Sequence, residues 1–583
     1  MTRSPEELEE AKQRRQQTSD DLVNSDAHKK LVVAGPGTGK THNFKRVLDK
    51  SGGGLAITFI RALAEDLGRD LGDLAQVNTF HGYCKHLAHN FGGVGGLTAK
   101  FDYFPGLPEL VAEDLEILGY DRVGREGLDR RIREMEEGDG ILPAALEIGN
   151  YYDAVGHNDI VYRVERHFEA NPESIPEHKV VVVDEYQDFN YLETRLIDSL
   201  AQASAVLIAG DDDQALYGFK GSSPRFIRDL AIEEEVEQFD LPYCSRCTEV
   251  VVEAVKQIVV EAQRRGNLAN RIMRPYLCYL PEKAEDSDRH PALIHAACSV
   301  ETNRVAYARK YIAQQVAEIP EEDIRESREG PHPTALVIGP LHYVRPICEH
   351  LAERFANVRL LESAKGGITA LDAYRRLARD FDSRLGWRIL LHVEPCDGAS
   401  DRIDRALREN ADLGALLPEE YRERHRGPAA LVEQLLDGED LTVDEIAELE
   451  TATGMTIDQI HAALGTDPEE EADEGAEGYD EEAEAEDEGP TIVCTSQVGA
   501  KGLSAEHVFI VGMVNGDIPR DPTNVTDDEV CQLIVGLSRT RKACHLVSAG
   551  NWLGVWKKES TFFRWLGDIA TERREIDKDY WNE

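Results

Sequence analysis

The chain has 583 residues, of which 41 % are hydrophobic, a length and composition that suit three or four globular domains and exclude a disordered polymer. Its 110 acidic residues outnumber 65 basic ones, so the net charge is −45. A field of that sign repels nucleic acid at low salt. Charge alone therefore argues against a nucleic-acid-binding protein, and only the motifs described below reverse that interpretation.

The sequence also indicates the cellular compartment of the protein and the salt concentration in which it works. No segment approaches the ~18–20 consecutive apolar residues of a membrane span, and the first residues are polar, so we expect a cytoplasmic protein without a signal peptide. Lysine is scarce relative to arginine, 19 against 46. Together with the acidity, this suggests a halophile with a salt-loaded cytoplasm, and an ordinary acidic bacterial protein is the alternative.

The ten cysteines form no disulfide framework, and a reducing compartment keeps them as thiols. Cys244 and Cys247 make one C-x-x-C pair, and Cys278 is the nearest other cysteine. A metal site would need two further ligands at suitable spacing, so the pair alone is a weak signal for metal.

Short apolar segments alternate with helical sequence in the first part of the chain. The segments at residues 31–34, 55–59, 180–183 and 205–209 predict strands of a parallel sheet with helices on both faces. Residues 85–171 interrupt this alternation and are rich in Glu, Leu and Arg at helical spacing. They predict a helical insertion.

The same pattern returns in the second half. Strands are predicted at residues 335–339, 358–361, 491–495, 508–512 and 543–547, and residues 367–489 form a second, mainly helical insertion. The insertion ends in an acidic tract, residues 467–488, with fourteen acidic residues and no basic one. Such a tract cannot bury apolar surface, so we expect a disordered loop there.

A glycine-rich segment follows the first predicted strand and opens a helix. It reads Ala34, Gly35, Pro36, Gly37, Thr38, Gly39, Lys40, Thr41, which is a phosphate-binding loop with alanine in the first glycine position. The backbone N–H groups of such a loop surround phosphate oxygens at a helix N-terminus. Lys40 would place a cation on the β- and γ-phosphates, and the Thr41 hydroxyl would bind Mg²⁺. A glycine-rich turn before a structural helix is the alternative, which the complete strand, loop and Gly-Lys-Thr sequence argues against.

Two carboxylates, Asp184 and Glu185, follow the predicted strand at residues 180–183. They stand at the edge where open α/β sheets bind ligands. Asp184 would hold Mg²⁺ through water, and Glu185 would polarise an attacking water. An acidic pair after a strand is usually a solvated loop, but an upstream phosphate-binding loop makes it a candidate for nucleotide hydrolysis.

With further segments, these motifs resemble the successive motifs of superfamily 1 DNA helicases of the UvrD/Rep (PcrA-like) family. The further segments are TFIRALA at 58–64, TFHG at 79–82, DEYQDFN at 184–190, GDDDQALYGFKG at 210–221, LPYCSR at 241–246, TSQVGAKGL at 495–503 and VGLSRT at 535–540. Chance does not produce this order over residues 31–547. The Gly-Asp-Asp-Asp-Gln block favours the UvrD/Rep branch over the RNA-helicase branch.

The resemblance implies ATP and Mg²⁺ as cofactors and assigns roles around the phosphates. Gln214 is similar to the glutamine that senses the γ-phosphate, and Arg246 and Arg539 are similar to the two arginines that the second domain extends onto it. An isolated arginine is more often part of a surface ion pair. For the contact with the adenine, we prefer Gln17 over Gln13 and Gln16. The family's tyrosine that stacks on the adenine aligns with Ser245 in this chain, and Tyr243 could take its place.

The resemblance also implies contacts with nucleic acid. Phe59, Tyr217 and Phe219 resemble aromatic residues on which single-stranded bases stack, although aromatic residues at such spacing are more often in the core. The other candidates are Arg61, Thr79, His81, Lys220, Ser496 and Lys501. The chain departs from the family at Arg61, at Phe219 with Lys220, and at Ser504, where the family has asparagine, Trp-Arg and a ribose-binding glutamate.

The implied fold class is α/β, with two tandem RecA-like P-loop NTPase domains that each carry an inserted mainly helical subdomain. The first domain covers residues 1–84 and 172–235 around an insertion at 85–171, and the second covers 236–366 and 490–583 around an insertion at 367–489. The implied function is an ATP-dependent DNA helicase, working as a monomer, that moves 3′-to-5′ on single-stranded DNA and unwinds duplex in repair, recombination or anti-phage defence. Two alternatives stay open: a DNA-dependent ATPase that senses DNA ends beside a partner nuclease, and an RNA-directed motor.

Overall fold

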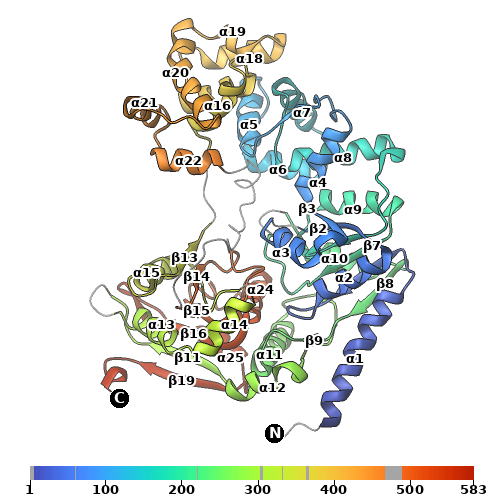
Figure 1. The fold of residues 1–583 in the computed structure, drawn as a ribbon, viewed down its shortest axis with the longest axis vertical. Helices are drawn as coiled ribbons and strands as arrows, with labels where there is room; N and C mark the ends of the chain where they lie inside the picture. Colours follow the sequence, from blue (N-terminus) through green and yellow to red (C-terminus); the bar gives the residue numbers. More distant parts are fainter. Residues whose placement is uncertain are drawn as a thin grey trace.

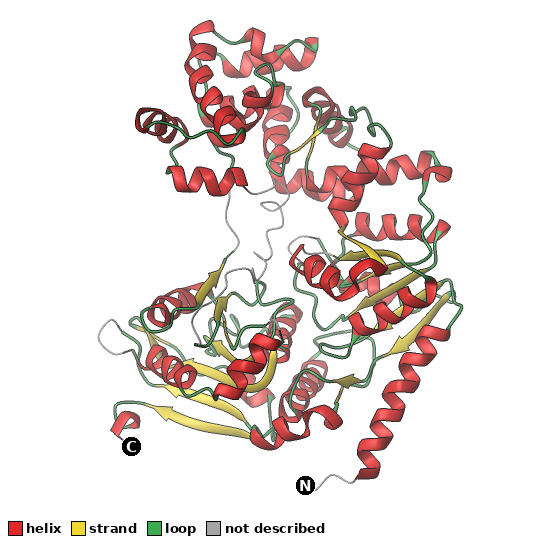
Figure 2. Cartoon of the chain, viewed as in Figure 1, coloured by secondary structure: helices red, strands yellow, loops and turns green. Residues whose placement is uncertain are grey.

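The computed structural model describes residues 5–58, 61–218, 221–302, 306–330, 332–362, 367–465 and 489–582. Two parallel sheets, each flanked by helices, make up one part of the molecule, and two groups of helices lie next to each other at the top of the view in Figure 1. Figure 2 shows how the strands of the large sheets are confined to the lower part. In the described part of the chain, no helix has the length and apolar composition needed to cross a membrane.

The first sheet has six parallel strands in the order β3-β2-β6-β7-β1-β8. Its strands are β1 (Lys29–Val33), β2 (Gly54–Thr58), β3 (Ala75–Thr79), β6 (Val181–Val183), β7 (Val206–Gly210) and β8 (Val236–Asp240). The four predicted strands correspond to β1, β2, β6 and β7, whose apolar residues are buried because helices cover both faces. These helices include α1 (Pro5–Asn24), α2 (Lys40–Ser51), α3 (Arg61–Leu71), α9 (Tyr191–Ala203) and α10 (Pro224–Leu230).

The sequence does not predict β3 and β8, which are the two edge strands. Their sequences, AQVNT and VEQFD, are largely polar and partly exposed, so they lack the apolar run that marks the central strands. Because β8 pairs with β1 from Lys29↔Val236 to Val33↔Asp240, the first sheet continues past residue 235. The predicted boundary at residues 235/236 is therefore one strand too early.

The second sheet has seven parallel strands in the order β13-β14-β12-β15-β16-β11-β19. They are β11 (Leu293–Cys298), β12 (Ala335–Ile338), β13 (Val358–Leu361), β14 (Ile492–Thr495), β15 (Ala505–Val511), β16 (Thr540–Ala549) and β19 (Thr571–Ile576). The surrounding helices include α11 (Glu249–Arg265), α12 (Leu280–Arg289), α13 (Tyr307–Ala317), α14 (Glu321–Glu329), α15 (Leu341–Ala352), α24 (Asp527–Ser538) and α25 (Phe562–Trp565). All five predicted strands are present, and β11 and β19 are additional. The prediction of an α/β fold with two tandem RecA-like domains is confirmed.

Both regions predicted as insertions are mainly helical. The first contains α4 (Phe80–Asn90), α5 (Leu107–Ile117), α6 (Gly124–Glu134), α7 (Ile141–Tyr152) and α8 (His157–Ala170), with the short pair β4 (Asp102–Tyr103) and β5 (Ala154–Val155). The second contains α16 (Ala370–Arg379), α17 (Arg384–Val393), α18 (Ala399–Glu409), α19 (Leu413–Leu416), α20 (Glu419–Leu436), α21 (Val443–Thr453) and α22 (Ile457–Gly465). Buried Arg388 joins them, since its Nε donates to Asp114 Oδ1 at 2.7 Å. The acidic tract at 467–488 lies outside the described residues.

Candidate active site

The segment between β1 and α2 folds as a tight loop. Gly37 and Gly39 have φ angles of 69° and 87°, in the left-handed region that favours glycine. Gly39 also caps α2, so the unpaired N–H groups at the start of this helix face the loop. A Cβ on Gly37 would lie 2.4 Å from the Cβ of Arg246, so a side chain there would collide with the segment that follows β8.

Asp184 and Glu185 follow β6 at the same edge of the first sheet. Lys40 Nζ is 3.5 Å from Glu185 Oε1. Burial raises the pKa of Asp184 to about 6 against the opposing charge of Lys40. Burial acts on Glu185 in the same direction, but the charges of Lys40 and Lys501 outweigh it and hold the pKa of Glu185 well below its usual range. Glu185 is therefore the more firmly ionised carboxylate of the pair.

Lys40 itself stays charged. Burial lowers the pKa of Lys40, but the charges of Glu185, Asp184 and Asp211 outweigh burial, so the pKa is raised above its ordinary value.

The backbone of Glu185 has a φ of 56°, a left-handed conformation that is unusual for a residue with a side chain and typical of functional sites.

A chain of hydrogen bonds connects the two sheets. Gln187 Nε2 donates to Glu185 Oε2 at 2.6 Å, and Gln187 Oε1 accepts from the Asp211 N–H at 2.9 Å. The Gln214 amide donates to the Asp211 carboxylate. Gln214 Oε1 in turn accepts from Arg539 Nη2 at 2.9 Å. The arginine of the second domain is thus linked to Glu185 of the first domain through three residues, Gln214, Asp211 and Gln187.

Lys501 makes a second connection between the domains. Its Nζ is 3.3 Å from Glu185 Oε2 and also contacts the Asp188 carboxylate. Burial lowers the pKa of Lys501 to about 8 against the charge of Glu185. The resemblance implies a DNA contact for Lys501, whereas the structure buries its ammonium group beside the Glu185 carboxylate. Burial also lowers the pKa of Arg539, to about 10, and the nearby charge of Arg246 adds to this effect.

One cavity of about 370 Å³ brings these groups together from both domains. All five predicted catalytic residues line it: Lys40, Glu185, Gln214, Arg246 and Arg539. The phosphate-binding loop contributes Pro36, Gly37, Thr38 and Gly39. Ala34 and Gly35 of the same segment do not line the cavity. Thr41 and Asp184 also line it, and a hydroxyl with a carboxylate beside phosphate oxygens is a donor set that suits Mg²⁺.

A neighbouring cavity of about 880 Å³ shares Thr38 and Gly39 with the first one. Gln17 and Tyr243, the residues predicted to contact the adenine, both line it, but so do Gln13 and Gln16, so the position alone does not separate the three glutamines. The Gln17 amide donates to Asp21 Oδ1 at 2.6 Å. Sequence reasoning missed two further residues of this wall, Arg15 and Tyr279. The Arg15 guanidinium lies 4.2 Å over the Tyr279 ring, and no motif marks either residue.

Sequence reasoning also missed the partners of Asp211, Asp212 and Asp213. These carboxylates could in principle hold a metal ion, but Arg274 pairs with all three of them. Arg271 adds a contact to Asp213 at 2.7 Å. Three consecutive buried carboxylates require cationic partners, because an unpaired buried charge is costly. The cations come from about 60 positions later in the chain, which sequence spacing does not reveal.

The predicted nucleic-acid residues are placed in different environments. Phe59, Phe219 and Lys220 lie outside the described residues, and Arg61 begins α3. Tyr217 is fully buried, which leaves no ring face for a base. The hydroxyls of Thr79 and Ser496 accept backbone N–H groups of their own turns, from Gly82 and Gly499.

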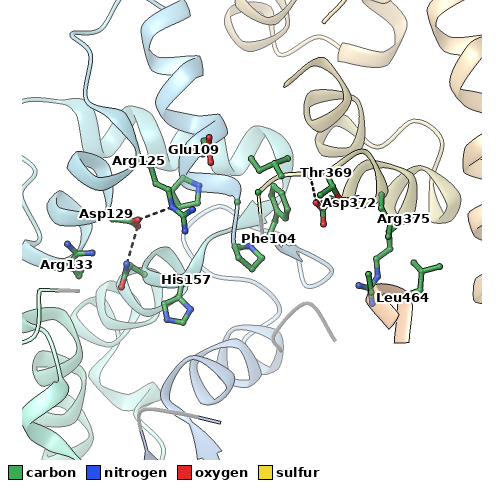
Figure 3. A pocket seen from close by; sticks show the side chains of 18 of the residues that line it. Phe104, Glu109, Arg125, Asp129, Arg133, His157, Thr369, Asp372, Arg375 and Leu464 are labelled. Carbon is green, nitrogen blue, oxygen red and sulfur yellow. Dashed lines mark hydrogen bonds and ion pairs between the residues drawn. The ribbon is translucent and has the colours of Figure 1, made fainter. Parts of the chain in front are cut away.

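His81 lies against residues that line a cavity between the two helical insertions. Its ring stacks on His157 with 3.3 Å between ring centroids, and its Nε2 lies 3.8 Å from Glu193 Oε1. His157 and Glu193 line a cavity of about 340 Å³. Figure 3 shows this cavity between Phe104, Arg125 and Arg133 of the first insertion and Arg375 of the second.

Comparisons with known proteins agree with this architecture. Residues 132–234 match the family model of the UvrD/REP helicase N-terminal domain. The chain is 26 % identical over 259 residues to the ATP-dependent DNA helicase UvrD1 of Mycobacterium leprae (strain TN), covering 34 % of this chain and 33 % of the relative. It is 25 % identical over 297 residues to UvrD1 of Mycobacterium tuberculosis (strain ATCC 25618 / H37Rv), covering 42 % and 38 %.

A further relative is the ATP-dependent DNA helicase PcrA of Staphylococcus aureus (strain Mu50 / ATCC 700699), which is 23 % identical over 283 residues, covering 40 % of this chain and 38 % of the relative. The matched segments thus span between 33 % and 38 % of the length of these three relatives. The family-model match over residues 132–234, the ordered motifs and the two parallel sheets together make the chain similar to the UvrD/Rep-like helicases of superfamily 1.

Proposed function

We propose that the chain is an ATP-dependent DNA helicase that moves 3′-to-5′ along single-stranded DNA and unwinds duplex. The observation that carries the proposal is the cavity between the sheets, where Lys40 and Glu185 of the first domain face Arg246 and Arg539 of the second. The names of the similar proteins, ATP-dependent DNA helicases from several bacteria, support the same activity.

The residues of the first domain bind the nucleotide phosphates and activate the attacking water. The N–H groups of the loop and the Lys40 ammonium hold the β- and γ-phosphates. Ionised Glu185 orients and polarises the attacking water. Thr41 and Asp184 would hold Mg²⁺, which when bound neutralises charge on the phosphate oxygens.

The residues of the second domain complete the site. Arg246 and Arg539 stabilise the negative charge that develops on the transferred phosphoryl group. Because Arg539 hydrogen-bonds Gln214, its position depends on how the second domain sits against the first. Loss of the γ-phosphate therefore weakens the contact between the domains and lets the cleft open.

One segment connects the nucleotide cavity with the space between the insertions. Residues 185–193 begin at Glu185 in the nucleotide cavity and end at Glu193 beside His81. Midway, Asp188 contacts Lys501 of the second domain and accepts the Leu216 N–H at 3.3 Å. A change at Glu185 can therefore reach the His81–His157 stack through a single short segment, which supports coupling of hydrolysis to movement on DNA.

The test is strand displacement on duplexes with a 3′ tail, a 5′ tail, or RNA in place of DNA. We expect ATP-dependent unwinding of the 3′-tailed DNA and none with Lys40→Ala. The assay is run at ~0.1 M and ~1 M KCl, because screening of the acidic surface is nearly complete at ~1 M, where the Debye length is about 3 Å, and a halophilic enzyme gains activity there. DNA-stimulated hydrolysis without unwinding would replace the proposal with an end-sensing ATPase, and unwinding restricted to RNA with an RNA-directed motor.

A further inference from the structure

Two buried thiols flank Ser245 and Arg246, which line the nucleotide cavity. Cys244 ends the short strand β9 (Tyr243–Cys244), and Cys247 lies three residues later. Both are free and fully buried. The Cys247 N–H donates to Cys244 Sγ at 3.4 Å. The C-x-x-C pair is therefore already in contact.

The pair lies next to the phosphate-binding loop and next to the segment that carries Arg539. A Cβ on Gly37 would be 3.1 Å from Cys244 Sγ, so Cys244 lies directly behind the loop. The Cys247 thiol donates to the Ser538 carbonyl at 3.5 Å, and Ser538 immediately precedes Arg539. Any change in the bonding of these sulfur atoms thus acts on the loop, on Arg246 and on the start of the Arg539 segment.

The arrangement suits disulfide chemistry better than metal binding. Cys278, the third cysteine nearby, donates to the Cys247 carbonyl at 3.5 Å and does not converge on the two other sulfur atoms. Within the described residues, the group whose ligand atoms all lie within 4.8 Å of one another is the aspartate triplet, not these cysteines.

We propose that Cys244 and Cys247 form a reversible modification site for small-molecule disulfides, and that closing the Cys244–Cys247 bond slows ATP hydrolysis by displacing Arg246. The effect on hydrolysis rests on the proposed function, whereas formation of the bond does not. The Cys244 thiolate attacks one sulfur of the reagent, and the other sulfur leaves and becomes a thiol by taking a proton. Cys247 then loses its proton and attacks the Cys244 sulfur, which releases a second thiol. Two electrons pass to the reagent, whose S–S bond is replaced by that of the protein.

The pKa values of the two thiols differ in the direction that these two reaction steps require. Burial raises the pKa of Cys244, but contacts with the Cys247 and Tyr276 side chains and with two backbone N–H groups outweigh burial and hold the pKa below its ordinary value. The contact with Cys244 and burial raise the pKa of Cys247 well above its ordinary value. Cys244 is therefore the attacking thiolate and Cys247 the resolving thiol.

The bond would alter the site in two ways. It removes the thiol hydrogen of Cys247, so the hydrogen bond to the Ser538 carbonyl is lost. It also draws the two sulfur atoms to about 2.05 Å, which tightens the turn that carries Arg246. Ser245 and Arg246 line the nucleotide cavity, so a reagent approaches the buried pair from there when the cleft opens.

The experiment treats the full chain with oxidised glutathione, maps its disulfides by mass spectrometry of a non-reducing digest, and measures ATP turnover before and after dithiothreitol. We expect a Cys244–Cys247 linkage and a loss of turnover of at least tenfold that dithiothreitol reverses. The turnover of Cys244→Ser and of Cys247→Ser should not respond to the oxidant.

A second thiol pair provides the matched control. Cys348 and Cys494 belong to one buried hydrophobic cluster, and neither they nor their chain neighbours line the nucleotide cavity. A Cys348→Ser/Cys494→Ser variant should keep the full response to the oxidant. Absence of a Cys244–Cys247 linkage after treatment would overturn the modification site. A linkage that leaves turnover unchanged would overturn the effect on Arg246. A reduced chain that hydrolyses no ATP would refute the proposed function instead, and the disulfide map would still decide the site.

Discussion

The two parallel sheets share an architecture but carry opposite charges into the cavity between them. In the first sheet, β1 is followed by the glycine-rich loop, and the ends of β6 and β7 present the carboxylates Asp184, Glu185 and Asp211. In the second sheet, β12 is followed by Gly339 and Pro340, and α15 begins directly at Leu341. The second domain contributes cations instead.

This difference explains why neither domain is complete alone. In the proposed mechanism, the first domain holds the groups that bind phosphate and activate water, and the second holds the arginines that neutralise charge in the transition state. Lys501 and Arg539 reach the first domain through Glu185 and Gln214. Substitutions on the two sides should therefore have different signatures, with binding lost on one side and turnover lost on the other.

Lys40→Ala should give the largest effect on the first domain. It removes the cation that faces the phosphates and leaves Glu185 without its partner at 3.5 Å. We expect turnover to fall by about 10³-fold or more and ATP binding to weaken as well. Steady-state hydrolysis and equilibrium titration with a fluorescent ATP analogue measure the two quantities. Full binding with full turnover would remove Lys40 from the site.

Glu185→Gln should separate binding from hydrolysis within the same domain. The amide keeps the shape of the side chain but cannot act as a base, so turnover should fall by about 10²–10⁴-fold while ATP still binds. Single-turnover hydrolysis is the measurement. Hydrolysis at the wild-type rate would mean that another group activates the water.

Arg274→Met tests how the acids of the first domain are held. Its guanidinium pairs with Asp211, Asp212 and Asp213, and its side chain is 3 % exposed. Leaving these carboxylates without that partner should cost about 3–5 kcal/mol of unfolding free energy. Arg225→Met is the matched control, since Arg225 pairs with Asp229 at the surface and its loss should cost less than about 1 kcal/mol. Equal urea midpoints for the two variants would contradict a structural role for Arg274.

Gln17→Ala should have the smallest effect. Gln17 lines the cavity next to the loop and can offer one hydrogen bond to a base, worth about 0.5–1.5 kcal/mol, or up to about tenfold in Kd. Gln13→Ala and Gln16→Ala serve as controls on the same helix. If one of the controls weakens ATP binding and Gln17→Ala does not, the base contact belongs to that glutamine.

The sequence predicts the central strands and the nucleotide motifs because both have strong local signals. The run of valines before Asp184 and the glycines before Lys40 need no tertiary information. The edge strand β8 escapes prediction because only its pairing with β1 makes VEQFD a strand.

The same distinction holds within the site. The sequence identifies Asp211 as part of a motif, but it does not show that Arg274 neutralises it, because that contact spans 63 positions. For Lys501 and Tyr217, family position implies a nucleic-acid contact, whereas the fold gives them buried surroundings that depend on the packing of the two domains.

The most direct test of a site shared by the two domains is Arg539→Ala, with ATP binding and single-turnover hydrolysis measured on the same preparation. We predict binding close to that of the wild type and a loss of hydrolysis of about 10³-fold or more, because the phosphates are held by the first domain and the arginine acts on the transition state. Arg541→Ala is the control, since Arg541 lines the same cavity but pairs with Glu506 at 3.5 Å, and its loss should be much smaller. Hydrolysis near the wild-type rate in Arg539→Ala would contradict a site completed by the second domain.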